Sequence, residues 1–221
     1  SKAKEQVGMA TPRRAAFTLL ELLVSVAVMA ALSALTCMAV GSARERARAI
    51  KVHAELYGLG VALEAYGIDC GGCFPPVRVN CNSDMQDHWC QLPMELADGR
   101  YIPPGPGGGL SATLVDEFNP GHTYKYAAPG PMLLNGTPAG NCQVWIPDDV
   151  PLCESAQGRY YYNPQTTPVR WMVWSTGPHP KSEKSCHERA PMAAASWYRG
   201  AGDEGVLVRF RDAQTCQFKS P

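Results

Sequence analysis

The sequence predicts an α+β fold in which one long N-terminal helix packs against a small antiparallel β-sheet. An apolar run extends from residue 17 to residue 41, and amphipathic sequence continues to about residue 66. Short aromatic or β-branched segments follow in the remainder of the 221 residues. One long helix before a run of strands is typical of α+β domains, because the apolar face of the helix needs a sheet to cover it.

The apolar run contains a single charged residue. Between Arg14 and Arg44, Glu21 is the only residue of the Asp, Glu, Lys, Arg and His types. An ionised group in hydrocarbon costs roughly 2.5 to 3.5 kcal/mol on insertion scales, and such groups are usually functional and paired. A cut before Phe17 would create an α-amino group near Glu21, so we expect that amine to be its partner.

The residues around Glu21 resemble the N-terminus of type IV prepilins and of type II secretion pseudopilins. That signature is a short basic leader, a small residue, and Phe-Thr-Leu-x-Glu opening an apolar helix; here Ala16 precedes Phe-Thr-Leu-Leu-Glu at residues 17–21. The resemblance implies that prepilin peptidase cuts between Ala16 and Phe17 and N-methylates Phe17. It also implies a helical, homo-oligomeric filament in which Glu21 neutralises the terminal amine of a neighbouring subunit. Ala16 stands where Gly is most frequent in the family.

Two plainer interpretations of this segment are a secretory signal and a simple membrane anchor. In a secretory signal the apolar region precedes the cut. Here the apolar run follows Ala16, so cleavage there keeps the anchor. A simple membrane anchor remains the alternative.

The expected organisation is a leader at 1–16, a membrane or filament-core helix at 17–41, an amphipathic helical half at 42–67 and a β-rich globular domain at 68–221. A helix over 17–66 is about 75 Å long, and the hydrocarbon layer is about 30 Å thick, so the second half leaves the membrane. A stripe in that half is expected to face the sheet, and it consists of Ala43, Ala47, Ile50, Ala54, Tyr57, Val61 and Ala65.

Five segments are predicted as strands: 123–127, 143–146, 159–162, 169–174 and 206–210. Pro- and Gly-rich stretches at 103–109 and 129–131 are read as loops. The tryptophans Trp145, Trp171, Trp174 and Trp197 are expected mainly in the core.

Eight cysteines lie beyond the apolar run: Cys70, Cys73, Cys81, Cys90, Cys142, Cys153, Cys186 and Cys216. An even number in an exported domain indicates disulfide bonds. Short loops favour Cys81 with Cys90 and Cys142 with Cys153, and Cys186 with Cys216 is a further hypothesis. The alternative is a zinc site of Cys70 and Cys73 with Cys81, His88 or Cys90.

Three shorter segments resemble the major pseudopilin, the G subunit of type II secretion. They are residues 62–75, 116–126 and 174–178, and unmatched inserts lie at about 76–113 and 127–168. Members of that family commonly bind Ca²⁺ in the loop after the third segment. Here His179 stands where Asp is frequent, and imidazole is a poor ligand for an ion that needs six to eight oxygens. We therefore expect no calcium, no other metal and no cofactor.

The resemblance implies a structural subunit of a type II secretion-like pseudopilus rather than an enzyme. Its expected partners are other copies, other pseudopilins, prepilin peptidase and the inner-membrane assembly platform. Before assembly it would be a single-pass protein of the inner membrane with a periplasmic domain. A type IV pilin for adhesion, motility or DNA uptake is the alternative, and a compact aromatic or basic patch on the inserts would favour it. Acidic and basic residues balance at 20 each, so no nucleic-acid partner is predicted.

Overall fold

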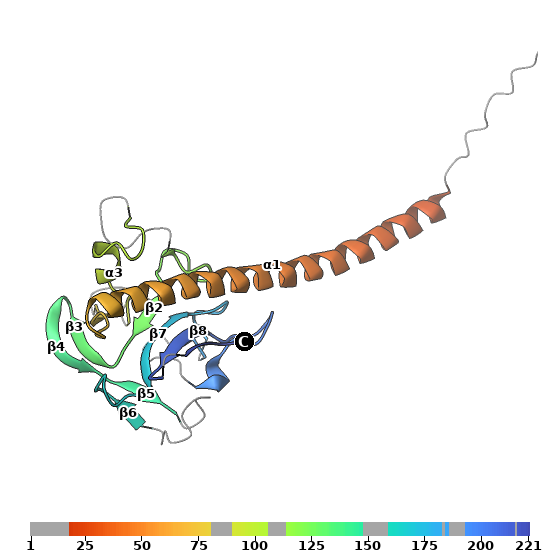
Figure 1. Cartoon of the computed structure of the whole chain (residues 1–221). Coiled ribbons are helices and arrows are strands. Elements are labelled where there is room, and N and C mark those ends of the chain that lie inside the picture. The colour runs from red at the N-terminus through yellow and green to blue at the C-terminus, as the bar shows by residue number, and fades with distance from the viewer. Residues whose placement is uncertain are drawn as a thin grey trace, which may run out of the picture. The chain divides into compact units, whose positions relative to one another are not determined.

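The computed structural model describes residues 18–80, 90–105, 114–147, 159–182, 184–185, 193–214 and 216–221 (Figure 1). The chain divides into two compact units, Ser1–Gly41 and Ser42–Pro221. Helix α1 (Leu19–Asp69) contributes to both units. The α+β prediction is confirmed: a long N-terminal helix precedes a small, mainly antiparallel sheet domain.

Short elements follow α1 along the described chain. Two are single helical turns, α3 (Glu95–Asp98) and η2 (Ala194–Ser196). The strands are β1 (Val77–Val79), β2 (Lys125–Ala127), β3 (Gly130–Leu134), β4 (Thr137–Cys142), β5 (Val144–Ile146), β6 (Arg159–Tyr161), β7 (Val169–Ser175), β8 (Leu207–Asp212) and β9 (Gln217–Lys219).

Among the described residues the strands form three hydrogen-bonded groups, here called ladders. Their strand orders are β1-β3-β4, β2-β7-β8-β9 and β5-β6. Gln91 joins the first two ladders, because it forms one isolated bridge with Arg78 of β1 and another with Lys125 of β2. All strand pairs are antiparallel except β1 with β3, which is parallel. Gln91 therefore makes one sheet out of the two larger ladders.

All five predicted strands are present, as β2, β5, β6, β7 and β8. The interpretation of residues 129–131 as a loop was wrong, because β3 begins at Gly130 and includes Pro131. A register irregularity follows Pro131 on this strand, and bulges of that kind are where Pro is tolerated in a sheet. Strands β1, β4 and β9 were not predicted; β4 contains Pro138 and Gly140, which sequence patterns read as turn residues.

The expected sheet-facing stripe of α1 is wrong. Ile50, Tyr57 and Val61 are 71%, 55% and 49% exposed, and Ala43, Ala47 and Ala54 are exposed as well. The face that packs on the sheet consists of Ala49, Val52, Leu56, Leu59, Gly60, Ala62, Leu63 and Gly67. Both stripes have helical spacing, but the second contains three leucines, and each buried leucine contributes about 1.5 to 3 kcal/mol. These leucines are the residues that the structure buries against the sheet.

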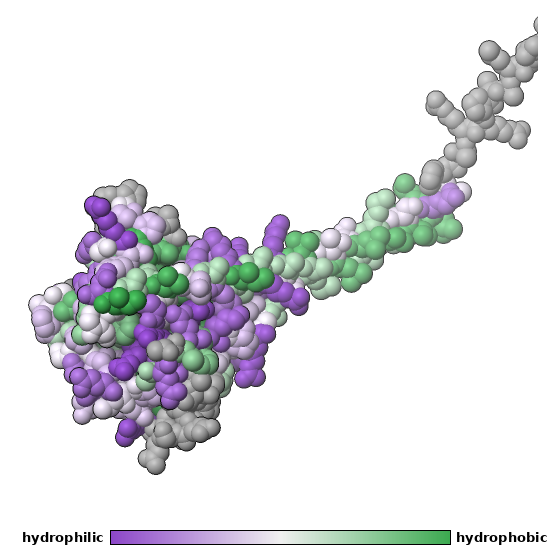
Figure 2. Space-filling view, in the orientation of Figure 1, coloured by the Kyte–Doolittle hydropathy of each residue, from purple (hydrophilic) through white to green (hydrophobic). Residues whose placement is uncertain are grey.

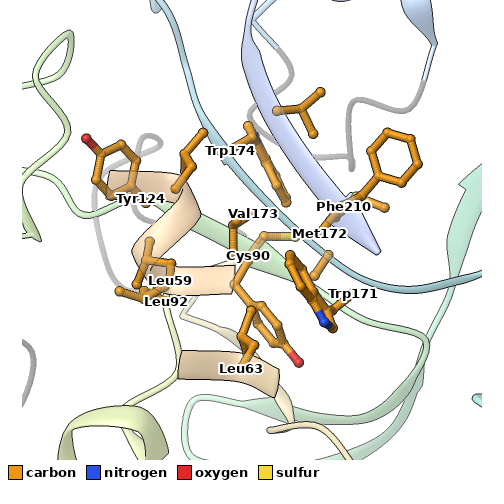
Figure 3. Packing of buried hydrophobic residues seen from close by; sticks show 14 of the residues in the cluster. Leu59, Leu63, Cys90, Leu92, Tyr124, Trp171, Met172, Val173, Trp174 and Phe210 are labelled. Carbon is orange, nitrogen blue, oxygen red and sulfur yellow. The ribbon is translucent and has the colours of Figure 1, made fainter. Parts of the chain in front are cut away.

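The core of the unit Ser42–Pro221 lies between this leucine face and β7. Leu56, Leu59 and Leu63 are at most 1% exposed, and they belong to the same cluster as Trp171 and Trp174 of β7 (Figure 3). Nearly every residue of β7 is buried, so both faces of this central strand are covered. Of the four tryptophans expected in the core, Trp171, Trp174 and Trp197 are buried, whereas Trp145 is 40% exposed.

Gly58 and Gly60 of α1 have different surroundings. A Cβ added to Gly60 would lie 2.9 Å from the Trp171 ring and 3.1 Å from Gln217 Oε1. The Trp171 ring cannot easily move away, because its indole N–H donates to Glu64 Oε1 at 3.0 Å. A Cβ added to Gly58 meets no atom within 4 Å. Close packing therefore requires glycine only at position 60.

This difference gives a matched pair of substitutions. We expect Gly58→Ala to raise the free energy of unfolding by up to about 1 kcal/mol, since Ala is the better helix former. We expect Gly60→Ala to lower it by about 1 to 3 kcal/mol through overpacking against Trp171. Urea unfolding of the full chain in detergent measures both. A stabilising Gly60→Ala would contradict the close packing of α1 on β7.

Candidate processing and assembly site

Thr18 and Glu21 form the N-terminal cap of α1. The Thr18 backbone N–H and hydroxyl both donate to Glu21 Oε2 at 2.9 Å, and the Glu21 N–H donates to Thr18 Oγ1 at 3.2 Å. This reciprocal Thr-x-x-Glu arrangement is a capping box, which satisfies backbone donors that the first helical turn leaves unpaired. The sequence analysis did not identify it, although the spacing of the two residues contains the signal. Both bonds to the carboxylate use Oε2.

The apolar half of α1 has no protein around it within its own unit. Its most apolar 18-residue window has a mean hydropathy of 2.3 and is 0% buried, and Figure 2 shows apolar surface along this part of the helix. The hydroxyls of Ser25 and Thr36 donate to the carbonyls of Glu21 and Leu32 at 2.7 Å, four residues earlier. Their polar groups are thus satisfied inside the helix, as hydrocarbon surroundings require. Glu21 is the one charge in this segment.

Residues 11–36 match the family model of the prokaryotic N-terminal methylation motif. The chain thus has a type IV prepilin-like N-terminus. The motif includes the expected cleavage position between Ala16 and Phe17, which lies outside the described residues, and it includes Glu21. No curated protein and no solved structure matches the chain significantly.

The methylation motif narrows the class of protein. It indicates a structural subunit of the pilin-like type, processed by prepilin peptidase, and not an enzyme family. The apolar helix that follows the leader is consistent with membrane anchoring. The motif is common to pseudopilus and pilus subunits, so the choice between them depends on the unit Ser42–Pro221.

The structure brings the three short segments of the sequence analysis together. Asp116, from the second segment, is 1% exposed. It accepts hydrogen bonds from Ser175 Oγ at 2.7 Å and from the Thr176 N–H at 3.1 Å, both in the third segment. The hydroxyl of Tyr126, also in the second segment, donates to the carbonyl of Pro75 in the first at 2.8 Å. The segments thus form one connected hydrogen-bonded group.

The Asp116 carboxyl group is buried, and both of its oxygens accept hydrogen bonds. Burial raises the pKa of its carboxyl, and the bonds from Ser175, Phe118 and Thr176 partly oppose that rise. Since every partner is a donor, the arrangement favours the ionised form locally while desolvation opposes it. Among the described residues, the charge of Asp116 also acts on Tyr124, whose pKa it helps to raise. Asp116 therefore holds the turn before β2 against the end of β7.

Three glutamates of α1 attach the helix to the sheet domain. Glu45 accepts from the Tyr198 hydroxyl at 3.1 Å, Glu55 accepts from the Tyr124 hydroxyl, and Glu64 accepts from Trp171 and pairs with Arg211. These contacts lie at the margins of the leucine face. Sequence patterns could not find them, because the donors come from residues more than 60 positions away.

The cysteine predictions remain untested. Cys70 and Cys73 are exposed free thiols, Cys90 is a buried one, and Cys142 and Cys216 are also free. Cys81, Cys153 and Cys186 lie outside the described residues, as does His88 of the zinc alternative. Burial raises the pKa of the Cys142 thiol to about 11.

No group of three or more His, Cys, Asp or Glu side chains that could hold a metal ion occurs in the described part of the chain. In the loop after β7, His179 is exposed. Nearby Asp203 accepts from Lys184 Nζ at 3.0 Å and from the Arg199 N–H at 2.9 Å. The hydrogen bond from Lys184 lowers the pKa of Asp203. An ammonium group thus neutralises this carboxylate.

The buried carboxylate predicts a pH-dependent effect of Ser175→Ala. A hydrogen bond to a charged group is worth about 1.5 to 3 kcal/mol, so the variant should lose about that much stability at pH 7. The pKa of Asp116 is raised above its ordinary value of 3.8. At a pH between the ordinary pKa and the raised pKa of Asp116, the folded state binds more protons than the unfolded state. The loss should therefore shrink as the pH falls toward 3.8 and Asp116 becomes neutral.

Denaturant unfolding at pH 7 and near pH 4 measures the effect. Ser196→Ala is the control, because its hydroxyl donates to the carbonyl of Ala193 and touches no carboxylate. Ser175 Oγ also accepts from the Gly177 N–H, and that contribution does not depend on pH. A Ser175→Ala penalty that is the same at both pH values would contradict the role assigned to Asp116.

Proposed function

We propose that this chain is a structural subunit of a type II secretion-like pseudopilus. The observation that carries the proposal is a prepilin-type methylation motif that continues into an exposed apolar helix with one acid, Glu21, in its first turn. Prepilin peptidase removes residues 1–16 and methylates Phe17. The mature chain remains in the inner membrane with its sheet domain in the periplasm. The assembly platform then adds it to the filament.

The capping geometry suits this role of Glu21. One carboxylate oxygen, Oε2, holds Thr18, and the described residues provide no hydrogen bond to Oε1. The second oxygen can therefore receive the N-terminal amine of a neighbouring subunit while the first keeps the helix start in place. A charge that is unpaired in the monomer and paired in the filament favours assembly, because hydrocarbon penalises the unpaired state.

The exposed face of α1 supports association between subunits. We call Ile50, Tyr57, Val61 and Ile68 the outer stripe; they are 49% to 80% exposed and follow helical spacing. Large apolar side chains aligned on one helix face are a typical contact surface. In the proposed filament, other copies of the chain or other pseudopilins cover the outer stripe.

The order and contacts of the three pseudopilin-like segments favour a pseudopilus over a pilus. Their joint hydrogen bonding through Asp116, Ser175 and Tyr126 provides a physical reason for them to occur together. In the adjacent loop we propose that the Lys184–Asp203 pair, rather than calcium, supplies the positive charge. We keep the disulfide pairings of the sequence analysis as a proposal for the exported domain.

One observation favours the second candidate, a type IV pilin that binds a target. Trp145 of β5 and Tyr160 of β6 are register partners whose ring centroids lie 5.0 Å apart. They are 40% and 49% exposed, and Tyr162 is 58% exposed. Val144 and Ile146 hold the underside of this hairpin in the core. The result is a compact aromatic patch on the insert at 127–168.

Glu21→Gln tests assembly separately from folding. Gln also satisfies a capping box, so the helix start should persist while the charge is lost. We expect normal cleavage after Ala16 but loss of filaments, observed by mass spectrometry of the N-terminus and electron microscopy of sheared filaments. Thr18→Ala is the control, because it weakens the cap by about 1 kcal/mol and keeps the acid. Wild-type polymerisation of Glu21→Gln, or mature protein that retains residues 1–16, would overturn the proposal.

Deletion of the gene separates the two candidates. For a pseudopilus subunit we expect secreted proteins to accumulate in the periplasm while surface pili remain, and the wild-type gene on a plasmid should restore secretion. Comparison of the secreted proteome with surface piliation measures both. Intact secretion with lost pili or lost adhesion would assign the chain to the second class.

A further inference from the structure

A hollow of about 790 Å³ with basic walls lies at the start of the unit Ser42–Pro221. It is lined by Arg46 of α1 and by Lys184, Arg199 and the loop Gly200–Asp203. Arg44 and Arg48 are exposed on the same two turns of α1 as Arg46. We call Arg44, Arg46, Arg48, Lys184 and Arg199 the basic patch. Arg44 and Arg48 lie on the side of α1 away from the hollow, because residues two apart do not share a helix face, so the patch surrounds the helix.

The loop that carries Arg199 is fixed against the helix. Glu45 Oε1 accepts from the Tyr198 hydroxyl at 3.1 Å and from the Gly202 N–H at 3.0 Å. These bonds flank Arg199 on both sides and hold it beside Arg46. The patch is therefore a built surface of α1 and the loop before β8, two regions about 150 residues apart in sequence.

The acids near the patch reduce its charge without cancelling it. The Glu45 carboxylate accepts two neutral donors and keeps its charge, and Asp203 pairs with Lys184. Glu204 is exposed beside Asp203. Five basic residues thus face three acids, and among the described residues Arg44, Arg46, Arg48 and Arg199 have no ion pair. A net positive charge remains, and guanidinium groups form bidentate hydrogen bonds with phosphate.

Chain connectivity keeps Arg44 near the end of the apolar segment. The apolar segment ends at Val40 and Gly41, and Arg44 follows Val40 by four residues. Four residues span at most about 14 Å even when fully extended, whatever angle the two units adopt. The polar headgroup layer adds about 5 to 8 Å on each side of the hydrocarbon. Where residues 19–40 span a membrane, Arg44 therefore lies within reach of the lipid phosphates.

We propose that the basic patch binds the headgroups of anionic phospholipids and holds the sheet domain against the membrane surface before assembly. The partner is the phosphodiester of a lipid such as phosphatidylglycerol, because its charge complements the patch and because the patch adjoins the membrane segment. The inference requires that residues 19–40 span a membrane, but it does not require a filament. Its failure is thus distinguishable from failure of the proposed function.

Hydrogen–deuterium exchange of the full chain in lipid nanodiscs tests this proposal. Nanodiscs of phosphatidylcholine are compared with nanodiscs that contain about 30% phosphatidylglycerol. We expect amides of residues 199–205 to exchange at least about 3-fold more slowly in the anionic discs. That protection should disappear at about 0.5 M NaCl, where charges are strongly screened.

The double variant Arg46→Gln with Arg199→Gln should lose this protection, while amides of β7 exchange as in the wild type and show that the fold is kept. Arg100→Gln is the matched control. Arg100 is an exposed arginine next to Tyr101, whose hydroxyl donates to Asp69 at the other end of this part of α1. Equal exchange in both kinds of nanodisc would overturn the proposal. An equal loss of protection in Arg100→Gln would also overturn it. Protection that depends on protein concentration rather than on lipid charge would overturn it too, because it would indicate a protein partner.

Discussion

Burial of the leucine face of α1 against β7 is the interaction on which the rest of the unit Ser42–Pro221 depends. Leu56, Leu59 and Leu63 are removed from water by the central strand of the sheet, and Gly60 lets Trp171 approach the helix backbone. Once this face is fixed, the opposite face of α1 is exposed. The same contact therefore decides both how the domain holds its helix and which apolar stripe remains for other molecules.

Polar contacts complete this attachment and orient the loops around it. Glu45, Glu55 and Glu64 each accept hydrogen bonds from the sheet domain at the edge of the leucine face. Partly buried bonds to carboxylates are directional, whereas apolar packing is not. The leucines thus supply non-directional stabilisation, and the glutamates add directional contacts at the edge of that face. Glu45 also places Arg199 beside Arg46. The position of these two basic residues therefore depends on the register of α1.

The first turn of α1 combines two roles in one carboxylate. Glu21 closes the capping box with Thr18 and is the one acid of the apolar segment. A cap needs an acceptor at this position, and Gln would serve equally well. An acid in the first turn is also favoured by the helix dipole. In the proposed filament, the N-terminal amine of a neighbouring subunit is the ionic partner of Glu21.

The sequence by itself determined the α+β class, the five aromatic or β-branched strands and the prepilin-type N-terminus, because hydrophobic period, strand propensity and a short motif are local properties. It could not choose between the two apolar stripes of α1, since both have helical spacing and only contact with β7 distinguishes Leu59 from Tyr57. It missed β3 and β4, where sheet pairing overrides the turn preference of Pro131 and Gly140. The connection of Asp116 with Ser175 and the basic patch around Arg199 were decided by tertiary structure, because each joins residues far apart in the chain.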